Sequence, residues 1–239
     1  LKKGQSYKLL GTLMDKETGK PIEVDGNPVT AETTFKPKKT SGSTEVKFTF
    51  DATSLRGKTI VVFEELYQDD LKLAVHADIE DEDQTIYFPE IKTTAKDAHT
   101  DSNLSLAGKE VTLVDTVTYK NLLPGKEYVM TGTLMDKETG EAVVIDDKKV
   151  TAETTFTPET AEGTVDVQFT LDGSTLAGKT VVVFESVSYE GKEFAVHADL
   201  KDDGQTIYFP EIKTTAKDNV SGNHYAKPEK EITLIDTVS

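Results

Sequence analysis

The chain of 239 residues repeats itself at a fixed offset. The six residues from Gln84 to Pro89 return unchanged from Gln205 to Pro210, an offset of 121 residues. A period of this length is far longer than a solenoid repeat and is a common size for an independent domain. The sequence therefore predicts domains in tandem.

The repeat is out of frame with the chain. The segment from Ile91 to Asp97 returns at Ile212 to Asp218, yet no counterpart precedes Leu1. We therefore divide the chain into three parts: residues 1–90 are a module that lacks its N-terminal segment, residues 91–211 are a complete module, and residues 212–239 match the start of a following module. We expect the whole to be an internal fragment of a longer protein.

Composition excludes several classes of partner. The 43 acidic against 27 basic residues give a net charge of -16, which disfavours binding to nucleic acid or an anionic membrane surface. There is no cysteine, so no disulfide reinforces the domains. No apolar stretch has the length of a transmembrane helix, and neither a signal peptide nor a wall-anchoring motif is present. We expect no nucleic-acid partner and no membrane insertion in this segment.

Short runs rich in β-branched and aromatic residues alternate with Gly, Asp, Asn and Pro, and none carries a helical apolar stripe. In the complete module these predicted strands span residues 128–134, 164–171, 180–188, 194–200 and 205–209. The pattern predicts an all-β chain of tandem immunoglobulin-like β-sandwich domains with about seven strands each. The connection at residues 89–93 is too short for a flexible hinge, so we expect the domains to stack end to end as a stiff rod.

Polar side chains share strand faces with apolar ones. In residues 111–119, Asp115 has the same parity as Leu113 and Val117, so it points to the face that should be buried. By the same rule Glu185 and Gln205 point inward with the apolar side chains of their own strands. Burying such groups unpaired costs several kcal/mol. They are therefore expected to meet one another or another polar group.

One histidine recurs with the repeat and is the candidate for that further polar group. His197 lies eight residues before Gln205, and His76 has the same relation to Gln84, whereas His99 and His224 do not recur. Taken alone, His197 is equally well explained as a core histidine satisfied by an acid. Thr93 shares strand parity with Ile91, and in a closed sandwich this first strand would lie beside the last and bring the hydroxyl to Gln205. Taken alone, however, Thr93 is better explained as a strand former.

At these residues the chain resembles the VaFE repeat family, the threonine-glutamine ester-bond domains that build stalks of Gram-positive surface adhesins. The resemblance covers nearly the whole chain. It is carried by Ile-Lys-Thr-Thr at Thr93, Asp-Thr-Val at Asp115, Val-Val-Phe-Glu at Glu185, and His-x-Asp at His197 followed by Gln-Thr-Ile at Gln205. It implies a pilin- or adhesin-type sandwich at the bacterial cell surface, anchored to the cell wall through the parent protein, and leaves the host ligand unknown.

The resemblance also implies a reaction. The Thr93 hydroxyl would attack the Gln205 carboxamide, ammonia would leave, and an ester would tie the first strand to the last. Threonine needs a base, for which neutral His197 is suited. We expect Asp115 to orient the imidazole and a protonated Glu185 to donate to the glutamine carbonyl. The bond forms once by autocatalysis, so the chain is not expected to be an enzyme, and no metal or cofactor is expected.

The frame of the repeat separates a second set of the same residues. The first module holds Glu64, His76 and Gln84, while the tail holds Thr214 and Asp236. We predict that the tail of one molecule completes the first module of the next, followed by a Thr214–Gln84 ester and head-to-tail polymers. The alternative is an open first module and a disordered tail.

Three other interpretations remain open at this point. A lysine-asparagine isopeptide bond is disfavoured because no asparagine recurs at the repeat offset, although a lysine-aspartate bond is possible. The modules could also be ligand-binding repeats without cross-links, and the acidic stretches 78–83 and 199–203 could bind calcium, but they lack the spacing of a known loop and are better explained as solvated turns. A Thr-His-Asp hydrolase would need an open cleft, whereas strand parity points these groups inward.

Overall fold

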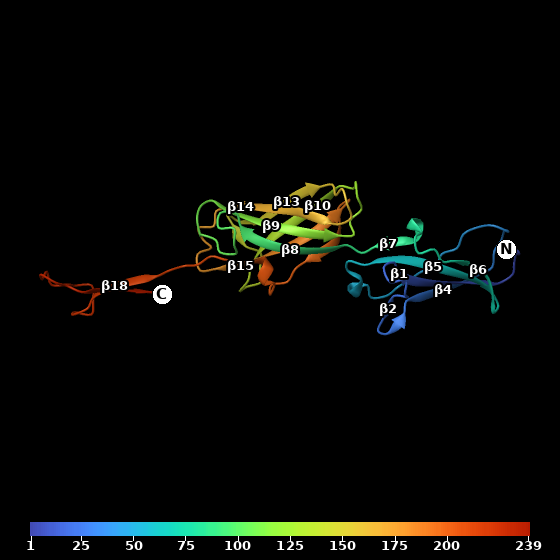
Figure 1. Ribbon diagram of the computed structural model, residues 1–239, viewed down its shortest axis with the longest axis horizontal. Helices are drawn as coiled ribbons and strands as arrows, with labels where there is room; N and C mark the ends of the chain where they lie inside the picture. Colours follow the sequence, from blue (N-terminus) through green and yellow to red (C-terminus); the bar gives the residue numbers. More distant parts are fainter.

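The computed structural model describes residues 1–239 and consists of strands with three short 3₁₀ turns and no α-helix (Figure 1). The first module, the complete module and the tail follow one another along the long axis of the molecule, with the N-terminus toward one end and the tail at the other. None of its elements is a helix long and apolar enough to span a bilayer. The predicted all-β class is confirmed.

The complete module is a sandwich of two antiparallel sheets. One sheet has the order β14-β9-β8, and the other has the order β13-β10-β15-β16 with β17 paired to β15. A small β11-β12 hairpin lies outside both sheets. The strands are β8 (Glu90–Asp97), β9 (Val111–Lys120), β10 (Tyr128–Asp136), β11 (Val144–Ile145), β12 (Lys148–Lys149), β13 (Thr151–Phe156), β14 (Gly163–Leu171), β15 (Thr180–Tyr189), β16 (Lys192–His197) and β17 (Thr206–Tyr208).

Strand alternation builds the core of this sandwich. In β9 the residues from Val111 to Tyr119 of one parity are buried, while their neighbours in the strand are more exposed. A cluster of 20 buried apolar residues fills the space between the two sheets. The inward orientation of Asp115, Glu185 and Gln205 that parity predicted is confirmed, because all three are buried within this core.

The first module has the counterpart of the five-stranded sheet of the complete module but not of its three-stranded sheet. Its order is β4-β1-β5-β6, with β7 paired to β5 and a separate β2-β3 hairpin. Residues 42–50, the counterpart of β14, pair with no strand, and only five apolar residues form the buried cluster. The strands are β1 (Tyr7–Asp15), β2 (Glu23–Val24), β3 (Asn27–Pro28), β4 (Thr30–Phe35), β5 (Thr59–Gln68), β6 (Leu71–His76) and β7 (Thr85–Tyr87).

The tail forms a hairpin of β18 (Thr214–Asp218) and β19 (Leu234–Val238). Thr214 pairs with Val238 and Ala216 with Asp236. In the complete module Thr93 pairs with Val117 and Ala95 with Asp115, so the register is the same at the repeat offset. The tail therefore already has the β8-β9 geometry, although nearly all of its side chains are exposed.

Two expected strands differ in the structure. The segment 194–200 is a strand only as far as His197, and Gln205 ends a 3₁₀ turn (Asp203–Gln205) instead of starting a strand. The turn forms because the side chain of Asp202 accepts a hydrogen bond from the Gly204 amide. The first and last strands also belong to different sheets, since β8 pairs only with β9 and β17 pairs with β15. A bond from Thr93 to Gln205 would therefore join the two sheets.

We expect the two modules to respond differently to the same core truncation. Leu134→Ala should lower the local free energy of unfolding of the complete module by about 2–5 kcal/mol, because a fully enclosed leucine leaves a cavity. The equivalent Leu13→Ala should cost clearly less, since the smaller core around it can collapse. Hydrogen exchange resolved by module measures both changes. Equal losses in the two modules would contradict this difference in packing.

Candidate functional site

Thr93 and Gln205 meet in the interior of the complete module. They are 112 residues apart in sequence, yet the Gln205 amide nitrogen donates directly to the Thr93 hydroxyl oxygen. Thr93 lies on β8, at the edge of the three-stranded sheet, and Gln205 ends the turn that leads into β17. Gln205 is fully buried, and Thr93 is 9% exposed. A hydroxyl and a carboxamide thus touch between the two sheets, shielded from solvent.

Two carboxyl groups lie beside this contact. Asp115 on β9 accepts a hydrogen bond of 3.1 Å from the Gln205 amide nitrogen through Oδ1. The carboxyl group of Glu185 on β15 lies within hydrogen-bonding reach of Asp115, and a bond between them requires a proton on one of the two. Burial raises the pKa of Glu185 to about 10, helped by the hydrogen bond and the charge of Asp115. Burial also raises the pKa of Asp115, to about 6, against the lowering effects of the Glu185 hydrogen bond and the nearby His197.

These pKa values imply that the pair keeps one proton near neutral pH, on Glu185. Asp115 Oδ2, both Glu185 carboxyl oxygens and Gln205 Oε1 are buried without a hydrogen-bond partner. Two carboxylates can only accept hydrogen bonds, so their contact becomes favourable once one of them carries a proton to donate. The predicted protonation of Glu185 therefore agrees with its surroundings.

The imidazole of His197 has a partner that the sequence did not indicate. Its Nε2 lies 2.7 Å from Asp202 Oδ2, and Asp202 Oδ1 accepts from the Gly204 amide at 2.8 Å. The first module has the same arrangement, with 2.6 Å between His76 Nε2 and Asp81 Oδ2. Because that module has no counterpart of Thr93 or Asp115 in contact with it, the His-Asp pair forms independently of the rest of the site.

The expectation that Asp115 orients the imidazole is therefore wrong, since Asp202 has that contact and Asp115 holds the amide of Gln205. The acidic stretch 199–203 is also more than a solvated turn, because one of its carboxylates fixes both the histidine and the turn that carries the glutamine. Strand parity could not identify Asp202, because this residue lies in a loop. The signal that could have revealed it is its recurrence as Asp81 at the repeat offset.

Gly132 makes room for the carboxyl group of Glu185. It lies directly opposite Glu185 in the β10-β15 ladder. A Cβ atom at this position would approach a Glu185 carboxyl oxygen to 2.7 Å and the Phe169 ring to 2.5 Å. Gly11 lies opposite Glu64 in the same way in the first module. Glycine here allows a carboxyl group to fit inside a strand ladder.

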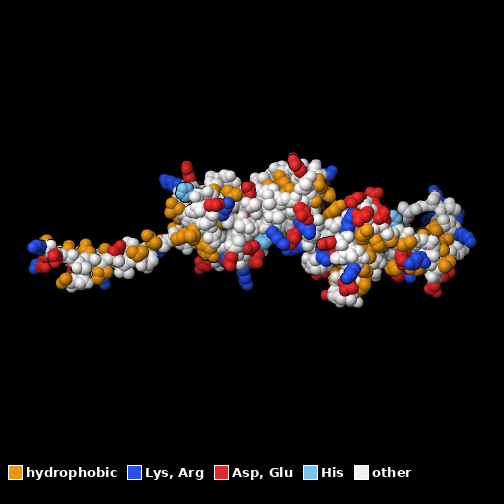
Figure 2. Space-filling model, viewed as in Figure 1, with side chains coloured by type: hydrophobic (Ala, Val, Ile, Leu, Met, Phe, Trp, Pro, Cys, Tyr) orange, Lys and Arg blue, Asp and Glu red, His pale blue; other side chains and the backbone are white.

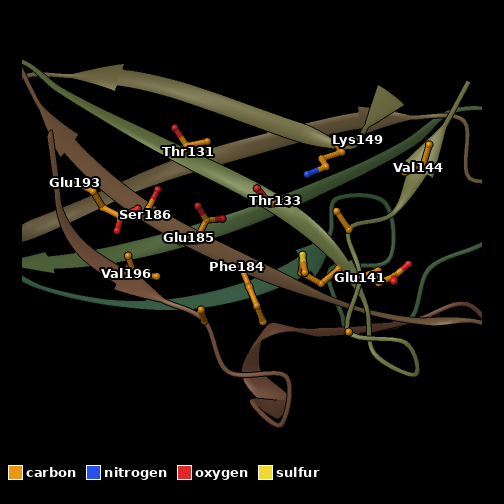
Figure 3. A pocket seen from close by; sticks show the side chains of 14 residues that line it. Thr131, Thr133, Glu141, Val144, Lys149, Phe184, Glu185, Ser186, Glu193 and Val196 are labelled. Carbon is orange, nitrogen blue, oxygen red and sulfur yellow. The ribbon is translucent and has the colours of Figure 1, made fainter. Parts of the chain in front are cut away.

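A groove on the outer face of the same sheet shares one residue with this site, Glu185. It has a volume of about 640 Å³ and is lined by side chains such as Thr131, Thr133, Phe184 and Val196 (Figure 3). These residues have the strand parity that points away from the core, and neither Thr93 nor Gln205 lines the groove. The contact of Thr93 with Gln205 thus lies outside the groove, and only Glu185 belongs to both.

The first module and the tail present the two separated halves of an equivalent site. Glu64 and Gln84 line an apolar cleft of about 460 Å³ that is open where the second sheet would pack. His76 lies beside Asp81, and burial raises the pKa of Glu64. Thr214 and Asp236 are exposed on the tail hairpin. Apolar side chains are visible on the surface of both parts (Figure 2). The structure therefore does not bring these residues together within one chain.

Comparison with known proteins places the chain in a family. A family model described as a T-Q ester bond containing domain matches residues 1–88, 89–209 and 210–239. The chain belongs to this ester-bond domain family. No curated protein matches it.

Two solved structures are similar to these ester-bond domains. Both are of a bacterial adhesin from Mobiluncus mulieris containing intramolecular disulfide, isopeptide and ester bond cross-links, in space groups P1 and P21. The identities are 16% and 17%, with TM-scores of 0.44 and 0.45. In each case the similarity covers 63% of this chain and 76% of the other.

The complete ester-bond domain holds the parts that acyl transfer requires. Thr93 supplies a hydroxyl in contact with a carboxamide, the His197-Asp202 pair can take up and return a proton, and a neutral Glu185 can donate one. The surroundings are dry, which favours an ester over its hydrolysis. No step in this chemistry needs a metal ligand or a cofactor from the chain.

The raised pKa of Glu185 predicts how the stability of the complete domain changes with pH. In a Thr93→Ala background, which cannot form the bond, the additional change Glu185→Gln should stabilise the domain at high pH. The folded state keeps the Glu185 proton while the unfolded state loses it above a pKa of 4.5, so stability falls as pH rises toward about 10. The advantage of glutamine should grow by up to about 1.4 kcal/mol per pH unit over this range and vanish near pH 4.

Urea unfolding at several pH values measures this difference. The change Glu193→Gln, at an exposed position of the same domain, is the control and should produce no such slope. A pH-independent gap between the two Thr93→Ala proteins would show that Glu185 is ionised when buried.

Proposed function

We propose that this chain is part of the stalk of a bacterial cell-surface adhesin and that its complete domain is reinforced by an autocatalytic ester bond between Thr93 and Gln205. The observation that carries the proposal is the direct contact of this hydroxyl with this carboxamide inside the core, beside two carboxyl groups. The bond forms once per domain, so the protein modifies itself and is not an enzyme.

The reaction begins when the Thr93 oxygen attacks the Gln205 side-chain carbonyl carbon and the imidazole of His197 takes the hydroxyl proton. Asp202 stabilises the charged imidazole through its Nε2 contact. Negative charge develops on the glutamine carbonyl oxygen, and the proton of Glu185 is available to stabilise it. The carbon-nitrogen bond then breaks, the nitrogen takes the proton from His197, and ammonia leaves. The products are one ester and one ammonia.

The position of the bond suits a protein that bears tension. Load enters the domain through β8, which follows directly from the first module, and leaves after β17 toward the tail. These two segments lie in different sheets, and an ester between Thr93 and Gln205 connects them covalently. The bond closes a loop of 112 residues, for which loop-closure entropy gives about 4–5 kcal/mol of stabilisation. Stretching the stalk would then load a covalent bond instead of strand hydrogen bonds.

The cellular setting follows from the same proposal. Family membership and the adhesin named among the similar structures support an extracellular position on the bacterial surface. We extend this to a Gram-positive cell wall, to which the parent protein would be anchored, with the host ligand bound elsewhere in that parent. The stalk function would need only the linear arrangement of domains seen in Figure 1.

Intact-mass measurement tests the bond. The purified chain should weigh one ammonia less than its sequence, and Thr93→Val or Gln205→Leu should restore the full mass because each removes one reacting group. Thr94→Val is the matched control, since Thr94 is the exposed neighbour of Thr93 on β8 and should leave the loss of ammonia intact. Alkaline hydroxylamine should cleave the link if it is an ester and leave it if it is an isopeptide bond. A chain of unmodified mass would refute the proposal.

A second proposal concerns bonds between chains. The tail hairpin has the register of β8 and β9, and the cleft of the first module exposes Glu64 and Gln84 where such a hairpin would pack. We propose that the tail of one chain fills the cleft of another and that Thr214 then forms an ester with Gln84, with His76 and Asp81 as the proton-accepting pair. The contact joins unlike surfaces, so it would extend into head-to-tail polymers.

Denaturing gels at high protein concentration test this second proposal. They should show a ladder of covalent oligomers that Thr214→Val abolishes, because the attacking hydroxyl is lost. Thr215→Val, which keeps the hairpin and the hydroxyl at position 214, should retain the ladder. Chains that stay monomeric at every concentration would exclude the exchange.

A further inference from the structure

The buried ester site reaches the surface through its His-Asp pair, since the side chain of Asp202 is 28% exposed and Glu185 only borders the groove on the outer face of the sheet. Thr93, Asp115, Glu185 and Gln205 are all buried, whereas the side chain of His197 is 23% exposed. His197 lines a pocket of about 460 Å³ at the junction between the two modules. Among the residues of the site, His197 is therefore the one that faces the junction.

The pocket opens onto the seam of the sandwich. Its walls in the complete module are the start of β8, at Glu90 to Lys92, and the strand β16 from Glu193 to His197. β8 and β16 are the edge strands of the two different sheets, and neither pairs with the other. The two strands lie side by side across the seam. The part of β8 that lines the pocket directly precedes Thr93 in the chain. An ester at Thr93 would lie just inside this opening.

The other wall of the pocket comes from the preceding module. Arg56, the only arginine of the chain, lines it together with Pro89 of the connection. The corresponding position of the complete module is Ala177, so the arginine is particular to this junction. A long cationic side chain from one domain thus lines the same pocket as His197 of the next domain, and the acidic Glu90 and Glu193 line it too.

Asn121 links the two modules at another point of their junction. Its side-chain nitrogen donates to the backbone carbonyls of Lys58 and Phe88, at 3.0 and 3.2 Å. Asn121 has a φ of 61°, a left-handed conformation that asparagine tolerates better than most residues. Since Lys58 lies two residues after Arg56, this clamp fixes the loop that carries the arginine.

We propose that the junction pocket is the solvent port of the Thr93–Gln205 site and that the preceding module controls access through it, with Arg56 covering the port and Asn121 holding the cover in place. This inference rests on the proposed ester. It implies that the lifetime of the ester in one domain depends on whether that domain stays packed against the domain before it. A stalk would then protect each ester by stacking, in addition to burying it.

Hydroxylamine cleavage of the folded, cross-linked chain tests the port. The reagent is small and neutral; its nitrogen attacks the ester carbonyl carbon, the bond to the Thr93 oxygen breaks, that oxygen regains a proton, and residue 205 becomes a hydroxamate. Mass spectrometry follows the change over time under native conditions. Arg56→Ala should accelerate cleavage several-fold by uncovering the port. Asn121→Asp should do the same, because a carboxylate would face two carbonyl oxygens and release the clamp.

Arg56→Trp separates access from stability. A larger apolar side chain should fill the pocket and slow cleavage, an effect that partial unfolding cannot produce. Lys148→Ala and Asn103→Asp, which change exposed residues away from the junction, should cleave at the rate of the parent chain.

The outcomes distinguish the port from the ester itself. Intact mass before treatment first reports whether the ester has formed, and a chain that never loses ammonia would overturn both proposals. A chain that loses ammonia but is cleaved at one rate in all the Arg56 and Asn121 variants would leave the ester standing and overturn the port.

Discussion

The structure of the complete domain depends on one constraint, which is that polar groups buried in a sandwich core must satisfy one another. Asp115, Glu185 and Gln205 project from three different segments into an interior otherwise filled by apolar side chains. The hydrogen bond from Gln205 to Asp115 and a proton kept by the carboxyl pair lower the cost of burying these groups. The same burial that makes these groups costly raises the carboxyl pKa values and excludes water, so the constraint on folding is also the source of the chemistry.

The location of the site follows from the architecture of two sheets. A sandwich has a seam where the edge strands of its sheets face each other without hydrogen bonds, and here these strands are β8 and β16. Thr93 comes from one side of the seam, while the turn that carries Gln205 belongs to the other. A covalent bond at this place adds a connection where strand pairing supplies none. Because the neighbouring domain lies over one end of this seam, we expect it to affect solvent access to the site.

The first module shows what remains when one sheet lacks its partner. Its β1, β4, β5 and β6 keep the order and register of the complete domain, and the pair of His76 and Asp81 is formed. Residues 42–50 stay unpaired, and the apolar face of the sheet is open. Local strand pairing and the His-Asp turn are thus properties of short segments, whereas the closed core requires a hairpin that this chain carries at its other end.

The sequence by itself determined the repeat, the all-β class, the inward direction of Asp115, Glu185 and Gln205, and the division of a second set of residues between the first module and the tail. These follow from period and parity, which are local properties of a strand. Only the tertiary structure decided that Asp202, and not Asp115, holds the imidazole, that Gly132 makes room for Glu185, that the first and last strands lie in different sheets, and that Arg56 of one module borders the site of the next. Those facts are contacts between segments distant in sequence, and such contacts depend on how the sheets and domains pack.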